Sequence, residues 1–402
     1  ALGNSKITSM SVTDTASNLN SKLNDLANLG SKLGSIVNTD GGNFSLTETE
    51  WRSLQPTLSK VAGGYAVDLT QVKSASALAL ANDPRIASIS VKDTGSALSS
   101  TLDGLNRLGT KLVSVDQTDL ANSIGITASQ WANQQSTIDK FASSSFAIKF
   151  ANSGQITELA SDERVSSISI NDTLSNVALK LDDIQAAITD LGANGRTVPI
   201  SIRLIGPPKA AQITAEQLVA DAAALETISG AYSLNVTGVA ADDASSTLAN
   251  SHVVGVAIKD TGEAILSNLT TLTGLGTKVT KLEQSDPQNN LELTQTQWMA
   301  NANLFKKFQN GIRANLSEVK AAQASGLLSD SRVEQVSVSD TADQISLKLN
   351  ALHGLGPSLT AIKVQDASTN PIQLTMAQFS LMGSTLAKID SGYKLSVSNA
   401  SA

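Results

Sequence analysis

The chain of 402 residues contains no cysteine and only two histidines, His252 and His353. Disulfides, thiolate metal sites and cysteine nucleophiles are therefore excluded. A zinc site, which usually depends on His and Cys ligands, would have to be built from almost nothing. The two histidines are far apart in the sequence and neither has a repeated partner, so both are predicted to be solvated surface side chains.

Charged and aromatic residues are also scarce, at 16% and 3% of the chain, and the net charge is −7. An acidic chain lacks the basic face that replaces counterions on nucleic acid, and it lacks a polybasic patch for anionic membranes. No apolar run reaches the roughly 18 residues of a membrane span. The polar surface must come from Ser, Thr, Asn and Gln, which favours an extracellular or cell-surface protein of a bacterium.

What the sequence has in abundance is internal repetition. An Asp-Thr pair follows a short run of alternating apolar residues five times, at spacings of 79, 79, 88 and 80 residues. The five aspartates are Asp14, Asp93, Asp172, Asp260 and Asp340. The alternation predicts a buried strand. The Asp stands where a helix N-cap belongs, and its carboxylate is expected to accept the first free backbone N–H groups.

An apolar stripe follows each Asp at the spacing of one helix face, with Leu19, Leu23, Leu26 and Leu29 in the first repeat. Gly30 follows at once, and a glycine there fits the left-handed position that ends a helix. A second strand comes next, and then a Leu/Ile-Thr pair with Glu or Gln three residues after the Thr. All five copies match the capping box, which predicts a second helix. The Thr–Glu/Gln pairs are Thr47–Glu50, Thr127–Gln130, Thr214–Gln217, Thr294–Gln297 and Thr375–Gln378.

A third strand and, in four copies, a short third helix complete the unit. The predicted fold is an α/β solenoid of about five 80-residue β-α-β-α-β-α repeats, with parallel strands on one face. The third repeat is longer by nine residues, and Pro207-Pro208 lies in its insertion region. The predicted repeats are residues 1–80, 81–159, 160–247, 248–327 and 328–402, the last ending early in its third helix.

By this alignment the chain opens and closes inside the same element of the repeat, and no polar capping repeat is visible. A second copy placed head to tail would continue the array almost in register, and such a contact propagates into a filament. The chain is therefore expected to be a homopolymer protomer. The alternative is that it is part of a longer repetitive chain. The predicted assembly interface consists of Leu2, Ile7, Tyr393, Leu395 and Val397.

A second acidic column lies in turn-like sequence, and its members are weak candidates for calcium: Asp40, Asp119, Asp286 and Asp366. Calcium needs six to eight oxygen ligands, and one Asp in each turn is too few unless neighbouring turns contribute. No confident metal site and no cofactor is therefore predicted.

A large apolar residue follows each capping-box Glu or Gln. The three tryptophans of this column could stack on a surface glycan, but core packing is the favoured interpretation. The column consists of Trp51, Trp131, Leu218, Trp298 and Phe379.

No catalytic residues are predicted. The glycine pairs lack the Lys and Ser/Thr of a phosphate-binding loop. Notable polar residues recur in columns, whereas a catalytic centre is ordinarily one asymmetric constellation. The chain is therefore expected not to be an enzyme.

The whole pattern, apolar-Ser-apolar-x-Asp-Thr, a Leu stripe, Leu-Gly, Leu/Ile-Thr-x-x-Gln and Tyr-x-Leu-x-Val, resembles tandem repeats of large secreted proteobacterial adhesins, surface-layer and matrix-filament proteins. The resemblance implies a structural protein outside the cell. The sequence therefore predicts a protomer of an extracellular filament or matrix. The alternatives are the stalk of a secreted adhesin that presents a separate binding domain and, less favoured, a carbohydrate-binding module.

Overall fold

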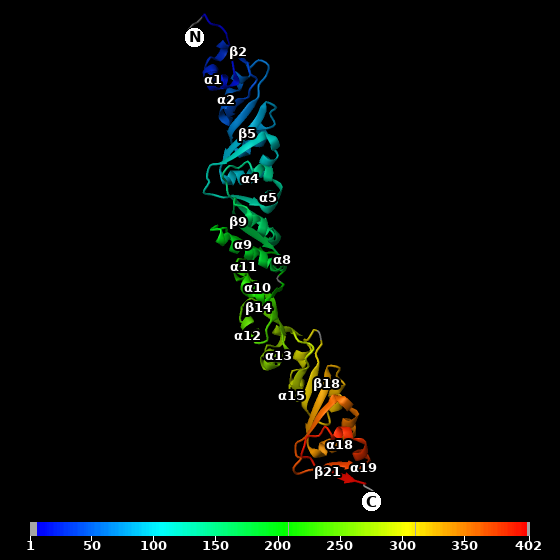
Figure 1. Cartoon of the computed structure of the whole chain (residues 1–402). Helices are drawn as coiled ribbons and strands as arrows, with labels where there is room; N and C mark the ends of the chain where they lie inside the picture. The colour runs from blue at the N-terminus through cyan, green and yellow to red at the C-terminus, as the bar shows by residue number, and fades with distance from the viewer. Residues whose placement is uncertain (1–5, 208, 310, 400–402) are drawn as a thin grey trace. The chain divides into compact units, whose positions relative to one another are not determined.

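The computed structural model describes residues 6–207, 209–309 and 311–399 (Figure 1). Backbone contacts divide the chain into two compact units. Unit 1 comprises Ala1–Gly206 and Asp221–Gly230, and unit 2 comprises Pro207–Ala220 and Ala231–Ala402. The division falls in the third predicted repeat, at the predicted insertion region.

Unit 1 alternates strands and helices along the chain. Its strands are β1 (Met10–Asp14), β2 (Leu33–Asn38), β3 (Phe44–Thr47), β4 (Val67–Val72), β5 (Ile86–Asp93), β6 (Leu112–Gln117), β7 (Ile124–Thr127), β8 (Phe146–Ala151), β9 (Val165–Asp172), β10 (Ile200–Leu204) and β12 (Ile228–Ser229). Its α-helices are α1 (Ala16–Asn28), α2 (Glu48–Leu58), α3 (Ser74–Leu80), α4 (Gly95–Asn106), α5 (Ala128–Asn133), α6 (Gln135–Ile138), α7 (Ile156–Ser161), α8 (Leu174–Leu179), α9 (Leu181–Ala193) and α11 (Ala222–Glu226).

Unit 2 alternates in the same way. Its strands are β11 (Ala211–Thr214), β13 (Leu234–Val239), β14 (Val253–Asp260), β15 (Val279–Gln284), β16 (Leu291–Thr294), β17 (Ala314–Val319), β18 (Val333–Asp340), β19 (Leu359–Val364), β20 (Ile372–Thr375) and β21 (Leu395–Ser398). Its α-helices are α10 (Ala215–Ala220), α12 (Ala244–Thr247), α13 (Gly262–Ser267), α14 (Leu269–Gly274), α15 (Gln295–Ala300), α16 (Ala302–Phe305), α17 (Ala324–Leu328), α18 (Ala342–Gly354), α19 (Met376–Leu381) and α20 (Gly383–Leu386).

The strands form several parallel sheets, so the predicted α/β class and the parallel pairing are confirmed. One strand order occurs four times: β3-β4-β5-β6, β7-β8-β9-β10, β11-β13-β14-β15 and β16-β17-β18-β19. In each case the strand before the capping-box helix comes first, and the Asp-Thr strand is third. Strand β12 adds a fifth strand beside β10. Two further sheets have only two strands, β1-β2 and β20-β21.

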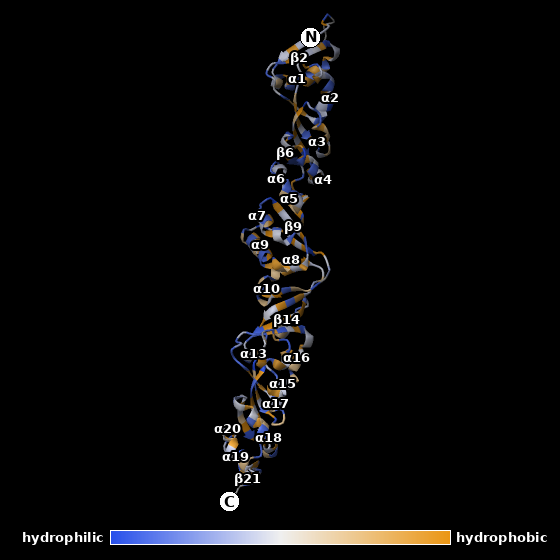
Figure 2. Cartoon of the chain, turned by 90° about the vertical axis from the view of Figure 1, so that its right-hand side faces the viewer, coloured by the Kyte–Doolittle hydropathy of each residue, from blue (hydrophilic) through white to orange (hydrophobic). Residues whose placement is uncertain are grey.

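The core lies where the sequence pattern places it. Alternate residues of the interior strands and one face of the long helices α1, α4 and α18 are apolar, and these positions are buried. Figure 2 shows apolar and polar residues mixed along the strands and helices. In the first helix the stripe residues Leu19, Leu23 and Leu26 are at most 7% exposed. Gly30 then adopts φ = +54°, a left-handed conformation that ends the helix as predicted.

The helix caps confirm one prediction and correct another. All five capping boxes form, with the Thr hydroxyl accepting from the Glu/Gln backbone and the Glu/Gln side chain accepting from the Thr backbone. The prediction that Asp is the N-cap of the first helix was wrong. The next residue is the cap, as in Thr15, whose hydroxyl accepts from Asn18 N–H. The strand continues through Asp14, whose Oδ1 accepts from Thr15 N–H and Asn18 Nδ2.

The third predicted repeat departs from the others because its Leu-stripe segment, formed by α8 and α9, is longer. Helix α9 runs through Gly192, and the left-handed glycine is Gly195 at φ = +66°. Arg196 follows and donates to the carbonyl oxygens of Ala160 and Asp162, both at 2.8 Å. In the preceding repeat Lys111 reaches the equivalent carbonyl, Ala81 O, at 2.8 Å. The insertion therefore lengthens the helix, and a basic side chain after it still donates to the carbonyl oxygens at the end of the preceding short helix.

Candidate functional site

The acidic turns suggested for calcium close the N-terminus of the Leu-stripe helix. Asp119 Oδ1 accepts from Gly95 N–H at 2.6 Å, and its Oδ2 accepts from Asn122 Nδ2 at 3.0 Å. These two bonds lower the pKa of Asp119. The same backbone bond, to the residue after the N-cap Thr, recurs for Asp40, Asp286 and Asp366 at 3.0, 2.8 and 2.7 Å.

These turns therefore have a structural role, because each carboxylate accepts a backbone N–H at a helix start. Within the described ranges, no group of three or more acidic or histidine side chains is arranged to hold a metal ion. The spacing of 24 residues between the acid and the helix start was visible in the sequence. The signal was missed because a cap so distant in the chain is not expected from local capping rules.

The Asp-Thr aspartates link two helix starts to one strand end. Asp172 Oδ2 accepts from Ser153 N–H at 2.9 Å and from Ser153 Oγ at 2.7 Å, while Oδ1 accepts from Thr173 N–H and Asn176 Nδ2 at 2.8 Å each. Asp172 is only 6% exposed, and burial by itself raises its pKa. The hydrogen bonds, led by those from Ser153, outweigh burial and lower the pKa overall. The ionised carboxylate thus acts as a fastener: it joins the helix start at Ser153 to the end of β9 and the helix start at Thr173.

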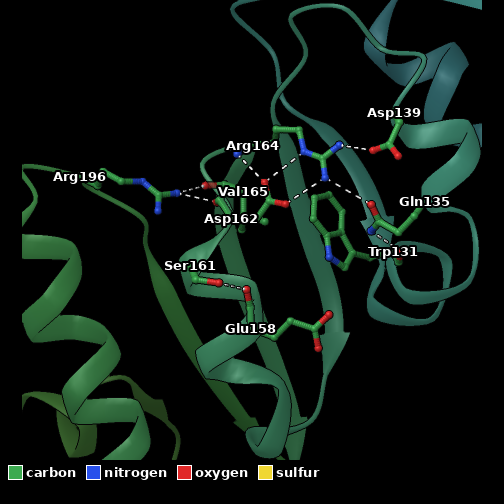
Figure 3. Close-up of polar contacts among 9 residues, drawn as sticks. All are labelled: Trp131, Gln135, Asp139, Glu158, Ser161, Asp162, Arg164, Val165 and Arg196. Carbon is green, nitrogen blue, oxygen red and sulfur yellow. Dashed lines mark hydrogen bonds and ion pairs between the residues drawn. The ribbon is translucent and has the colours of Figure 1, made fainter.

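The tryptophan column is buried beneath arginines. Arg164 lies over the Trp131 ring at 5.0 Å, and it is held in place by Asp162 at 2.9 Å and Asp139 at 2.8 Å (Figure 3). The bond to Asp162 is the largest cause that raises the pKa of Arg164. Arg85 over Trp51 and Arg332 over Trp298 repeat the stack at 4.9 and 5.0 Å.

The three indoles are 3–6% exposed, so the prediction of core packing is confirmed for them. A ring covered by guanidinium on one side cannot offer that face to a sugar. Phe379 differs, because it is 43% exposed although it occupies the same column. The prediction of core packing was therefore wrong for Phe379. Leu218 is half-buried.

Both histidines are half-buried and have partners, so the prediction of solvated surface side chains was wrong. His252 takes the place of the arginine at the start of the fourth predicted repeat and stacks on Tyr232, with ring centroids 3.9 Å apart and an interplanar angle of 5°. His353 Nδ1 lies 2.9 Å from Thr385 Oγ1. Sequence reasoning missed the role of His252 because its stacking partner, Tyr232, lies 20 residues away in the chain.

The predicted assembly residues lie at the two half-sheets. Ile7 precedes β1 in unit 1, and Tyr393, Leu395 and Val397 lie in or just before β21 in unit 2. Ile7, Tyr393 and Leu395 are half-buried, and Val397 is 39% exposed. Leu2 lies outside the described residues.

Strand β21 pairs with β20 alone among the described strands, and β1 pairs with β2 alone. In the four full sheets both equivalents are interior strands. Each half-sheet therefore has an edge that is covered by a strand in every full sheet.

One cleft lies beside the lengthened helix of the third predicted repeat. It encloses about 1040 Å³ between α7 and α9 and is lined by residues that include Ala160, Ala187, Asp190 and Arg196. Arg196 is committed to backbone carbonyls, and Asp183 on the rim pairs with Lys180 at 3.0 Å. The cleft follows from the additional turn of α9.

The comparisons with known proteins find no family model, no curated protein and no solved structure that matches the chain. In the part of the chain that the structure describes, no helix combines the length and apolar character needed to cross a membrane. Among the described residues, the strongest candidate for a functional surface is the pair of half-sheets, whose strands β1 and β21 each lack a second neighbouring strand.

Proposed function

We propose that the chain is a non-enzymatic structural protein, the protomer of an extracellular filament or surface matrix. In this proposal its α/β repeats form a solenoid, and copies join head to tail through the solenoid ends. The partner is a second copy of the same chain.

The observation that carries the proposal is a difference in burial between equivalent residues. Leu395 and Val397 lie in the first three residues of β21. Leu395 is half-buried, and Val397 is 39% exposed. Their counterparts at the start of β4, β8, β13 and β17 are at most 1% exposed. The sequence thus carries core residues at a position where the described chain supplies no cover. Burying such apolar surface contributes about 25 cal/mol per Å², before the costs of association.

The same difference is found at β1. Ile7, Met10 and Val12 are half-buried, whereas the corresponding residues of β5, β9, β14 and β18 are at most 6% exposed. Two complementary faces of this kind are typical of a heterologous contact between identical subunits.

The test is a concentration series of the purified chain by light scattering. The unmodified chain is expected to form oligomers of increasing size with concentration. Val397→Lys is expected to remain monomeric, because a charge would be buried in the joint. Val113→Lys is the matched control: Val113 is 55% exposed in β6, which belongs to neither two-stranded sheet, and its variant should associate normally.

An unmodified chain that stays monomeric at millimolar concentration would contradict the proposal. That result would favour the adhesin-stalk alternative, in which the chain spaces another domain from the cell. The carbohydrate-binding alternative has less support, since the three indoles that would stack on sugars are buried under arginines.

A further inference from the structure

We infer that the joint between two copies is one continuous parallel sheet, in which β21 of one copy pairs with β1 of the next in a defined register. This inference rests on the proposed function and specifies its interface. The two half-sheets would then form the order β20-β21-β1-β2.

The strand order supports this arrangement. In every full sheet the first two strands are the one before the capping-box helix and the one after it, and the last two are the Asp-Thr strand and its successor. Sheet β20-β21 contains only the first pair, and sheet β1-β2 contains only the second. Placed side by side, the two half-sheets reproduce the order found four times within the chain.

The internal sheets also fix the register. The second and third strands begin with the pairs Val67↔Ile86, Phe146↔Val165, Leu234↔Val253 and Ala314↔Val333. The equivalent pair between copies is Leu395 with Ile7, followed by Ser396 with Ser9. This register places Leu395 and Ile7 together on the apolar face, and a slip of either strand by one residue would turn its apolar side chains to the other face.

A backbone hydrogen bond recurs at this point. The first residue of the second strand donates to the carbonyl just before the third strand, as in Val67 N–H to Arg85 O at 2.8 Å and Phe146 N–H to Arg164 O at 2.8 Å. The bonds from Leu234 and Ala314 are 2.7 and 2.8 Å. Between copies the same bond joins Leu395 N–H to the Lys6 carbonyl.

The side chain of Lys6 gives the joint a second anchor. Lys6 occupies the column of Arg85, Arg164 and Arg332, each of which lies about 5 Å from a tryptophan ring. The last member of the tryptophan column is Phe379, whose side chain is 43% exposed. In the proposed joint the Lys6 ammonium of the next copy lies over Phe379, as a cation over an aromatic face.

Asp14 fits the same arrangement. Its equivalents Asp93, Asp172 and Asp340 are 6–8% exposed, and each accepts a backbone N–H from the helix start that follows the second strand. Asp14 is exposed, and its described bonds come from Thr15 and Asn18, within its own helix start. Among the described residues, Asp14 therefore lacks the bond from a following helix start that its equivalents accept.

The experiment uses disulfide formation between two variants, since the chain has no cysteine of its own. Ser9→Cys and Ser396→Cys are purified separately, mixed and oxidised. Paired residues on adjacent parallel strands lie within the 4.4–6.8 Å Cα separation that a disulfide requires. The expected result is a 9–396 linked dimer, which peptide mass spectrometry identifies. Thr13→Cys mixed with Ser396→Cys is the matched control, because exposed Thr13 lies four residues further along the strand, about 13 Å from residue 9.

A second measurement tests the aromatic anchor. Phe379→Ala is expected to weaken association of the otherwise unmodified chain about tenfold. Leu381→Ala is the control, because Leu381 is 75% exposed on the same helix but lies outside the column. Equal effects of the two variants would overturn the role of Phe379.

The outcomes separate the two proposals. If the unmodified chain associates but the control pair links as well as the 9–396 pair, the register is wrong and the proposed function survives. If the unmodified chain does not associate at any concentration, the proposed function fails and this inference fails with it. A 9–396 link that forms in preference to the control supports both.

Discussion

Replacing Asp172 with Asn tests whether the Asp-Thr aspartates fasten the fold. The amide oxygen can keep the bonds from Thr173 and Asn176 that Oδ1 accepts. The amide nitrogen then takes the place of Oδ2, which accepts from Ser153. The Ser153 hydroxyl can rotate and accept from this nitrogen, but the Ser153 N–H is left facing another donor.

The magnitude follows from that geometry. Ser153 is 1% exposed, so water cannot satisfy its N–H. The variant loses one charge-assisted hydrogen bond and leaves a buried donor without an acceptor, which together cost about 2–4 kcal/mol. Asp14→Asn is the matched control, because both described bonds of Asp14 go to Oδ1 and an amide oxygen can accept them. Its expected cost is below about 0.5 kcal/mol.

Hydrogen exchange is the suitable assay, because it reports local opening in a chain of two units. In Asp172→Asn the peptides that span Ser153 to Asn176 should exchange about 30 to 800 times faster, since 1.4 kcal/mol corresponds to a tenfold change. Peptides around residue 14 should change little in the control. Equal, small effects of the two substitutions would refute the fastener role of the buried aspartate.

Four further predictions concern other features. Arg164→Ala should lower the free energy of unfolding by about 1–2 kcal/mol through the lost stacking on Trp131, measured by urea titration, whereas an unchanged midpoint would show that the stack contributes nothing. Gln71→Gly should stabilise the chain by about 1 kcal/mol, because Gln71 has the left-handed φ of +56° that glycine adopts more easily. Gly238 occupies the equivalent position with φ = +71°, so Gly238→Ala should destabilise the chain. Melting temperatures that shift in the same direction for both variants would contradict this reasoning. The pKa values of Asp172 and Asp119 are lower in the folded chain than in free Asp, so their carboxylates stabilise the fold at any pH above the ordinary Asp pKa. Thermal melts followed by circular dichroism should therefore show stability falling as the pH drops below about 4. A melting temperature that does not change with acid would count against a role for the ionised carboxylates. A chelator should leave the melting temperature unchanged within about 2 °C, because Asp119 and its equivalents are satisfied by N–H donors, and a large drop would restore calcium to these turns.

Much of the local structure could be predicted from the sequence. The Thr–Glu/Gln pairs, the Leu stripe and the left-handed Gly30 are short-range signals, and each formed as expected. The parallel strand pairing followed from strands that alternate with helices.

The misses involve contacts between positions far apart in the chain. Asp93 was expected to cap the helix that follows it, but its Oδ2 accepts from Ser74, 19 residues earlier. His252 was expected to be solvated, but it stacks on Tyr232. Local sequence could not reveal this contact, because the two residues are 20 positions apart. Phe379 was expected to be buried because it shares a sequence column with three tryptophans. In the described chain, however, no strand preceded by an arginine pairs with β21, so no arginine covers the Phe379 ring. Periodicity identifies the column, and burial depends on the neighbouring strand.

The most direct test of end-to-end assembly is electron cryomicroscopy of the purified chain at high concentration. The account predicts threads of uniform width, whose density at each joint shows the four strands β20-β21-β1-β2 side by side and parallel. Single particles without joints, or contacts made through another surface, would contradict it.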